Sequence, residues 1–226
     1  MSEANFVELC LQPRLKGTQG DIEAARTLVD AAFRIGYTQV GVLVPHMLRP
    51  LRELSEKNVI VGIIIDVGSV SELKDALLRT RDAEMVVVRA GSEKLTRAAL
   101  ESKKADVVMS PYSGERLNQV HARIARDNCV AIALSLRECI ERRGGARSKV
   151  LSGYRECVQL WRKLSFPLVL TTEPSHVLEL RCSREVEALC SLFGMHKGEV
   201  KNVLSSGEST IKRARSELPD GIEVPD

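Results

Sequence analysis

The segment VIVGIII, which runs from Val59 to Ile65, is the longest apolar run in the chain and decides the fold prediction. Apart from its glycine it consists of β-branched residues, a composition typical of a strand that is buried on both faces. The amphipathic stretch Val70 to Thr80 follows it and predicts a helix, and EMVVV, from Glu84 to Val88, predicts the next strand. A strand, a crossover helix and a second strand form the repeating unit of a parallel sheet.

The same alternation extends over most of the 226 residues. Predicted strands are Asn5 to Cys10, Gln39 to Val44, Val59 to Ile65, Glu84 to Val88, Asp106 to Met109, Cys129 to Leu134 and Pro167 to Thr171. Predicted helices run from an N-cap at Asp21 to a stop at Gly36, and over Leu48 to Lys57, Val70 to Thr80, Glu93 to Lys103, Glu115 to Asp127, Lys149 to Leu164, Ser183 to Phe193 and Gly198 to Leu204. A barrel and an open doubly wound sheet both fit this order. Because no glycine-rich phosphate-binding motif follows the first strand, we predict an irregular, TIM-like (β/α) barrel.

The domain prediction is a single α/β barrel domain over residues 1–205, followed by a mobile C-terminal tail over residues 206–226 that is acidic at its end. Within the domain, the glycine pair in RRGGARSK, from Arg142 to Lys149, predicts a mobile basic loop. No apolar run approaches the ~20 residues of a membrane helix, and the amino end has no signal pattern, so we expect a soluble, cytoplasmic protein. The six cysteines show no C-x-x-C spacing and are expected to be free, buried thiols.

Charge is unevenly distributed along the chain. The net charge is +3, but the last ten residues contain four acidic and no basic residues, which leaves 33 basic against 26 acidic residues, or +7, over residues 1–216. Between Arg137 and Lys163 there are eight basic and three acidic residues. Such a patch favours an anionic partner such as a nucleic acid. Arg155, Gln159 and Arg162 align on one helix face there, either as a solvated face or as a surface for phosphates.

Polar residues follow many of the predicted strands, where the loops of a parallel barrel form a common rim. These rim candidates are Glu8, His46, Asp66, Arg89, Ser110, Ser135, Arg137, Glu173 and His176. One alternative function uses five of them, Glu8, His46, Asp66, Glu173 and His176, to hold a divalent metal in a stand-alone phosphoesterase. None of the dense ligand motifs, such as H-x-H or H-E-x-x-H, supports that site.

Three arginines offer a different chemistry. Arg89, Arg97 and Arg181 could emerge at or near one rim, where guanidinium groups bind phosphate in bidentate fashion, or they could form local salt bridges. His121 lies on or beside the apolar face of its helix, which favours a packed or edge histidine over an acid–base group.

Four segments resemble the ribonuclease P protein component 3 family of archaea and eukaryotes. They are VVVRAGSEKLTRAALE (Val86 to Glu101), HARIARDNCVAIALSLRECIE (His121 to Glu141), the stretch from Lys163 to Met195 and SSGESTIKRAR (Ser205 to Arg215). The resemblance covers most of the chain and is fainter before Gly36. It implies an α/β barrel similar to the PHP phosphoesterase fold, used as a non-catalytic subunit while the RNA subunit and its Mg²⁺ ions remove the 5′ leader of precursor tRNA.

The resemblance also implies partners and site residues. The implied partners are ribonuclease P RNA, ribonuclease P protein component 2, other ribonuclease P proteins and, indirectly, precursor tRNA, with no membrane and no cofactor bound by the protein. By resemblance, Arg89, Arg97, His121 and Arg181 contact RNA or support activity. On charge grounds alone we add Arg142, Arg143, Arg147 and Lys149. The first strand carries ELCLQP where metal-dependent PHP enzymes have an H-x-H pair, which puts catalysis by the chain itself in doubt. The short chain is more typical of an archaeal protein.

Overall fold

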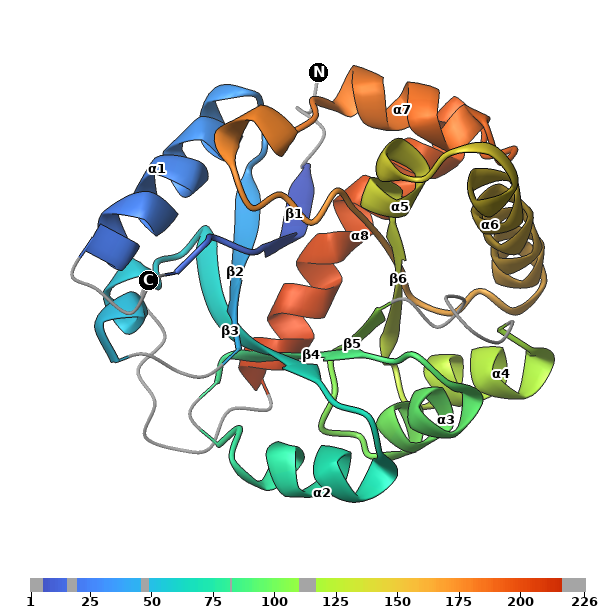
Figure 1. Ribbon diagram of the computed structural model, residues 1–226, viewed down its shortest axis with the longest axis horizontal. Coiled ribbons are helices and arrows are strands. Elements are labelled where there is room, and N and C mark those ends of the chain that lie inside the picture. Colours follow the sequence, from blue (N-terminus) through green and yellow to red (C-terminus); the bar gives the residue numbers. More distant parts are fainter. Residues whose placement is uncertain (1–5, 16–19, 46–48, 82, 110–116, 217–226) are drawn as a thin grey trace.

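The computed structural model describes residues 6–15, 20–45, 49–81, 83–109 and 117–216 (Figure 1). Within these residues seven parallel strands form one sheet in the order β1 to β7, so each strand pairs with the next along the chain. The strands are β1 (Val7–Leu11), β2 (Gln39–Val44), β3 (Val59–Asp66), β4 (Met85–Arg89), β5 (Val107–Met109), β6 (Ala131–Ser135) and β7 (Leu168–Thr171). All seven predicted strands are confirmed to within two residues at each end.

Helices surround this sheet (Figure 1). They are α1 (Gly20–Arg34), α2 (Val70–Leu78), α3 (Glu93–Glu101), α4 (Gln119–Asp127), α5 (Leu136–Glu141), α6 (Gly144–Leu164), α7 (Ser183–Ser191) and α8 (Lys197–Ser216), with the short 3-10 helices η1 (Arg49–Leu54) and η2 (Val177–Glu179). Local sequence explains several starts, because Ser69, Ser92 and Asn118 each cap a helix by accepting a hydrogen bond from a backbone N–H three residues later. The helix predicted over Leu48 to Lys57 is the 3-10 helix η1.

The sheet curls into a nearly closed barrel, which confirms the predicted fold class. Strands β1 and β7 share no ladder of backbone hydrogen bonds, but contacts just beyond and between them close the seam. The Gln12 N–H donates to the Pro174 carbonyl over 2.9 Å, and the Glu8 carboxylate accepts from Thr171 Oγ1 and from the Thr172 N–H. Side chains therefore tie the first strand to the last.

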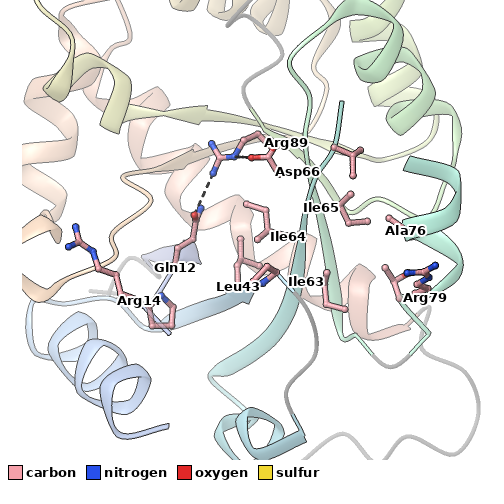
Figure 2. A pocket seen from close by; sticks show the side chains of 14 residues that line it. Gln12, Arg14, Leu43, Ile63, Ile64, Ile65, Asp66, Ala76, Arg79 and Arg89 are labelled. Carbon is pink, nitrogen blue, oxygen red and sulfur yellow. Dashed lines mark hydrogen bonds and ion pairs between the residues drawn. The ribbon is translucent and has the colours of Figure 1, made fainter. Parts of the chain in front are cut away.

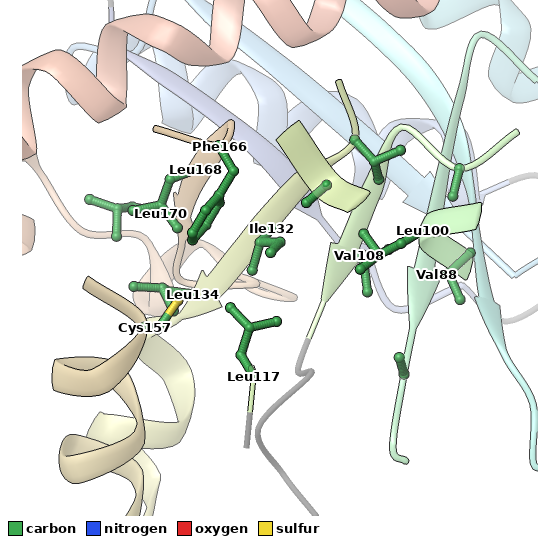
Figure 3. Packing of buried hydrophobic residues seen from close by; sticks show 14 of the residues in the cluster. Val88, Leu100, Val108, Leu117, Ile132, Leu134, Cys157, Phe166, Leu168 and Leu170 are labelled. Carbon is green, nitrogen blue, oxygen red and sulfur yellow. The ribbon is translucent and has the colours of Figure 1, made fainter. Parts of the chain in front are cut away.

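Two layers of apolar side chains hold the barrel together. Successive residues of β4 alternate between them: Met85 and Val87 point into the barrel, whereas Val86 and Val88 point toward the surrounding helices. The outer layer is mostly aliphatic, and Figure 3 shows part of it around Ile132, with Phe166 and Cys157 among the packed side chains. Burial of both faces explains why the strands read as continuous apolar runs.

Helix α8 corrects the predicted domain boundary. We predicted that the last helix ends at Leu204 and that a tail begins at residue 206, but α8 continues to Ser216, and Gly207, Thr210, Ile211 and Ala214 are buried. Ile211 and Ala214 belong to the inner layer of the barrel. The polar composition of SSGEST predicted a loose segment. Instead, one face of α8 closes the end of the barrel at which the strands begin. Residues 217–226 of the predicted tail lie outside the described residues.

Two further predictions need correction. The expected mobile loop from Arg142 to Lys149 is wrong, because α5 ends at Glu141 and α6 begins at Gly144. Gly144 has a φ of 51°, a conformation that glycine adopts without strain, so the glycine pair starts a helix here. All six cysteines are free, but only four are buried as predicted, because Cys182 is half-buried and Cys129 is exposed. Among the described residues, no helix is both long and apolar enough to cross a bilayer.

Candidate functional site at the carboxyl-terminal rim of the barrel

Arg89 is the centre of a charged cluster at the rim where the strands end. It is the last residue of β4, and its Nη2 atom lies 2.6 Å from Glu173 Oε2, just after β7. Its Nε atom lies 3.4 Å from Asp66 Oδ2 at the end of β3. Gln12, which follows β1, donates from Nε2 to Glu173 Oε2 over 3.1 Å. We call Gln12, Asp66, Arg89 and Glu173 the rim cluster.

The rim cluster is only partly open to solvent. The side chains of Glu173 and Arg89 are 4% and 28% exposed, whereas that of Asp66 is 70% exposed. Burial alone lowers the pKa of Arg89, but the charges of Glu173 and Asp66 and the hydrogen bond to Glu173 outweigh it, so the pKa is raised. Arg137 also supports this loop, because its Nη1 atom donates to the Glu173 carbonyl over 3.1 Å. The guanidinium of Arg89 is thus a permanent cation between two carboxylates.

Glu8 lies directly beneath the rim cluster and is fully enclosed, at 1% exposure. Its carboxylate accepts hydrogen bonds from Thr171 Oγ1 and from the N–H groups of Cys10 and Thr172. Burial raises the pKa of Glu8 from 4.5 to about 7, although these three hydrogen bonds oppose the change. The Glu8 carboxyl therefore titrates near neutral pH inside the seam between β1 and β7.

An open hollow adjoins the rim cluster (Figure 2). It has a volume of about 620 Å³ and apolar walls that include Leu43, Ile63 and Ile65. Arg14, Arg79 and Arg89 also line it, and Figure 2 shows Arg14 and Arg79 on opposite sides. Arg14 is held in place by Ser175, to whose Oγ atom its Nε donates over 3.1 Å. The hollow thus combines apolar walls with cationic groups.

Four of the five predicted metal ligands lie in the described part of the chain, and these four do not assemble into a metal site. Glu8 accepts protein donors, and Asp66 and Glu173 are paired with Arg89, which occupies the position between them that a metal cation would need. His176 Nδ1 accepts the Leu178 N–H over 3.3 Å, and His46 lies outside the described residues, as does Ser110. In the described part of the chain, no group of three or more His, Cys, Asp or Glu side chains could hold a metal. The arrangement gives the metal-dependent phosphoesterase hypothesis no support.

The arginines predicted to share one rim are dispersed. Only Arg89 belongs to the rim cluster. Arg97 lies on α3 and pairs with Glu101 over 2.8 Å, and Arg181 follows η2, where its Nη1 atom donates to the carbonyls of Leu178 and Leu180. Helices α3 and α7 are separated by α4 and α6 around the barrel in Figure 1, so Arg97, on α3, lies apart from Arg181, which comes just before α7.

His121 was predicted to contact RNA or to support activity, and the structure contradicts a direct contact. Its side chain is on the buried face of α4 and is 2% exposed. A buried imidazole presents no surface to an RNA. The packed histidine that the apolar face of this helix also indicated is the correct interpretation.

The basic residues chosen on charge grounds lie close together in sequence at the junction of α5 and α6. Arg142 pairs with Glu138 over 3.3 Å, whereas Arg143, Arg147 and Lys149 form no ion pair within the described part of the chain. We call Arg142, Arg143, Arg147 and Lys149 the α6 basic cluster. Farther along α6, Arg162 makes a bidentate pair with Glu199 of α8, at 2.7 and 2.8 Å, and Arg155 donates to the Leu192 carbonyl over 3.3 Å, so two residues of the predicted phosphate surface make contacts within the protein.

Comparisons with known proteins agree with the order of these elements. The family model described as RNase P subunit p30 matches residues 5–217. The chain belongs to the RNase P subunit p30 family. It is similar to ribonuclease P protein component 3 of Methanothermobacter thermautotrophicus, with 33% identity over 207 residues and 84% of each chain covered. It is 30% identical to component 3 of Methanococcoides burtonii, over 99% of this chain and 95% of the relative.

Solved structures show the same fold. A chain in a cryo-EM structure of archaeal ribonuclease P with mature tRNA matches this RNase P subunit with a TM-score of 0.77 and 16% identity, over 96% of this chain and 94% of the other. A Xaa-Pro dipeptidase matches with a TM-score of 0.63 and 10% identity, over 95% and 76%. The predicted family, barrel fold and role as a ribonuclease P protein subunit are therefore confirmed.

Sequence reasoning missed two members of the rim of this p30-family chain, Gln12 and Arg14. Both come just after β1, so the rule that strand ends meet at one rim applied to them as it did to Asp66. The predicted first strand ended at Cys10, one residue before the end of β1 at Leu11, and its only rim candidate was Glu8. The partner of Arg89 could not be found from spacing, because Glu173 is 84 residues away along the chain.

Proposed function

We propose that this ribonuclease P subunit has no catalytic centre of its own and contacts the RNA subunit through the α6 basic cluster. The observation that carries the proposal is the set of three cations at the start of α6, Arg143, Arg147 and Lys149, which have no carboxylate partner in the described part of the chain. Cations without internal partners are available to phosphates, and each phosphate contact releases counterions.

The position of the α6 basic cluster favours an anionic partner. Arg143 is the N-cap residue of a 21-residue helix, and Arg147 lies one helical turn later, so the two side chains are neighbours on the helix surface. The partial positive charge at the helix N-terminus adds to theirs. A carboxylate or a phosphate is stabilised there, and the phosphates of an RNA backbone match three adjacent cations better than one isolated anion does.

The geometry of the rim cluster favours a non-catalytic role for the protein over a hydrolytic one. Both of its carboxylates are paired with Arg89, and the carboxyl of Glu8 is enclosed and hydrogen-bonded, so neither Glu173 nor Glu8 is free to activate water. In the proposed function, Mg²⁺ ions held by the RNA subunit perform the hydrolysis that removes the 5′ leader of precursor tRNA. The protein partners are ribonuclease P protein component 2 and other ribonuclease P proteins, and precursor tRNA is contacted indirectly.

A reconstitution experiment tests this function. Labelled precursor tRNA is incubated at low Mg²⁺ with ribonuclease P RNA and component 2, with and without this chain, and with this chain alone. We expect cleavage at the mature 5′ end to require the RNA and to increase on addition of the chain. No increase would contradict the subunit role, and chelator-sensitive cleavage by the chain alone would contradict the absence of a catalytic centre.

A further inference from the structure

A basic, partly apolar hollow begins at the carboxyl end of α8. Its inner part, of about 190 Å³, is lined by Ala214 of α8 together with side chains of α2, β4 and the segment after α3. Its outer part, of about 480 Å³, runs between α2 and α3. The two parts share Leu77 and Lys104, so they are adjacent. We call them together the α2–α3 groove.

The walls of the groove carry unpaired cations. Lys74, Arg81, Lys103 and Lys104 line it, all four are exposed, and none forms an ion pair within the residues that the structure describes. Three carboxylates also line the groove, but each is paired with an arginine: Glu101 with Arg97, Asp106 with Arg213 and Glu84 with Arg215. The four cations are therefore left without a carboxylate partner among the described residues.

The floor of the groove is aliphatic. It is formed by Val70, Leu73, Leu77, Leu78 and Ala98, and the Leu78 side chain is 63% exposed. Phosphates would satisfy the cations but not this floor. The groove best fits an extended peptide that carries both carboxylates and aliphatic side chains.

The chain itself contains such a peptide directly after α8. Residues 217–226 read ELPDGIEVPD, with four acidic residues, no basic residue and three aliphatic ones, Leu218, Ile222 and Val224. These three are separated by even numbers of residues, so they share one side of an extended chain. The prolines at positions 219 and 225 favour extended backbone over helix.

We propose that residues 217–226 bind in the α2–α3 groove of the same chain, with their carboxylates against its cations and their aliphatic side chains on its floor. Ser216 ends α8 two residues after Ala214, which lines the groove, so the segment starts at the site. Ten extended residues reach about 33 Å, and α2, with nine residues, is about 14 Å long. Bound in this way, the segment withholds four cations from RNA and leaves the α6 basic cluster free. This proposal does not depend on the RNA contact proposed above.

Backbone dynamics of the full chain test the proposal. The heteronuclear ¹H–¹⁵N NOE is measured at low salt for the non-proline residues of 217–226, in the wild type and in the Lys103→Glu/Lys104→Glu variant. We expect the NOE values of the wild-type segment to be close to those of α2 and α3, and those of the variant to be typical of a free chain. Amide exchange in the segment should be faster by about tenfold or more in the variant. Arg26→Glu/Arg34→Glu, which reverses two exposed cations of α1, is the matched control and should change nothing.

A charge exchange separates direct pairing from a general charge effect. Adding Glu217→Lys and Asp220→Lys to the Lys103→Glu/Lys104→Glu variant should restore the wild-type NOE values, and Leu78→Ser should weaken binding without a change in charge. The proposal is overturned if the wild-type segment behaves as a free chain, or if its chemical shifts respond to the α6 basic cluster instead. Protection that rises with protein concentration would also overturn it, because the occupant would then be a second copy. The proposal is also overturned if the wild-type segment behaves as a free chain and the chemical shifts of the groove residues change only when RNA is added.

Discussion

The Nη2 atom of Arg89 lies 2.6 Å from Oε2 of Glu173, so that a single ion pair joins the end of β4 to the loop after β7 across the mouth of the barrel. Both side chains are mostly buried, and Gln12 shares the same carboxylate oxygen. From the sequence, Arg89 could bind phosphate or form a salt bridge. Its geometry makes it first of all a residue that holds the rim of the barrel together.

Loss of Arg89 should therefore destabilise the protein. Arg89→Ala leaves the Glu173 carboxylate buried without its charge partner, and we expect the free energy of unfolding to fall by about 3 kcal/mol. Asp66→Asn is the control, because the Asp66 side chain is 70% exposed and its pair with Arg89 should contribute less than about 1 kcal/mol. Urea unfolding of both variants measures the difference. Equal stability of the two variants would show that the pair with Glu173 does not hold the rim.

Glu8 should make stability depend on pH near neutrality. Its pKa is raised by burial from 4.5 to about 7, so between these values the folded protein binds a proton that the unfolded chain has released. Stability from this group is full below pH 4.5 and is lost as the pH rises through 7. The stability of the wild type relative to Glu8→Gln should fall by about 2 to 3 kcal/mol from pH 5 to pH 8. Urea unfolding at both values measures it, and a difference that does not change with pH would contradict the shifted pKa.

Gly207 marks the closest approach of α8 to the barrel. A Cβ atom at this position would lie 2.8 Å from Cβ of Val7, which cannot move without its backbone. We expect Gly207→Ala to lower the free energy of unfolding by about 1 to 3 kcal/mol, in spite of the better helix propensity of alanine. Thermal unfolding tests this, and Val7→Ala in the same chain should recover little of the loss, because alanine keeps the Cβ atom that lies 2.8 Å away. A stabilised Gly207→Ala variant would mean that the helix shifts freely.

Truncation distinguishes the predicted domain boundary from the observed one. A chain that stops after residue 205 loses Ile211 from the barrel interior and loses Arg213, whose Nη2 atom lies 2.9 Å from the nearly buried Asp106. We expect this chain to lose its cooperative unfolding transition, whereas a chain that stops at Ser216 keeps it. Circular dichroism during heating compares them. A normal transition in the shorter chain would show that the barrel needs only the first part of α8.

Removal of charge from the α6 basic cluster should weaken RNA binding in a salt-dependent way. For Arg147→Ala/Lys149→Ala we expect weaker binding to ribonuclease P RNA, with a slope of log affinity against log salt that is smaller by about 1 to 2. The control, Arg26→Ala/Arg34→Ala, removes two exposed cations from α1, which lies on the other side of the barrel from α6 (Figure 1). Equal slopes for the two variants would contradict a specific contact at α6.

Several features followed from the sequence alone. All seven strands were predicted, because a strand covered on both faces must be apolar at every position and therefore stands out as a run such as VIVGIII. The family was also recognised from the order of segments. The hydrophobic pattern is a local property of the sequence, so it can be recognised without knowledge of the tertiary contacts.

The tertiary structure alone decided what each charged residue does. Arg89 pairs with Glu173, which is 84 residues away in the sequence, the His121 side chain lies in the core, and Arg162 pairs with Glu199 of α8. The segment after Ser205 looked like a tail because it is polar in composition, yet its buried face needed only a few small and aliphatic residues to fill the end of the barrel. Electrostatic partners and close approaches depend on distances between elements that are remote in the chain, and a linear sequence does not specify those distances until the barrel closes.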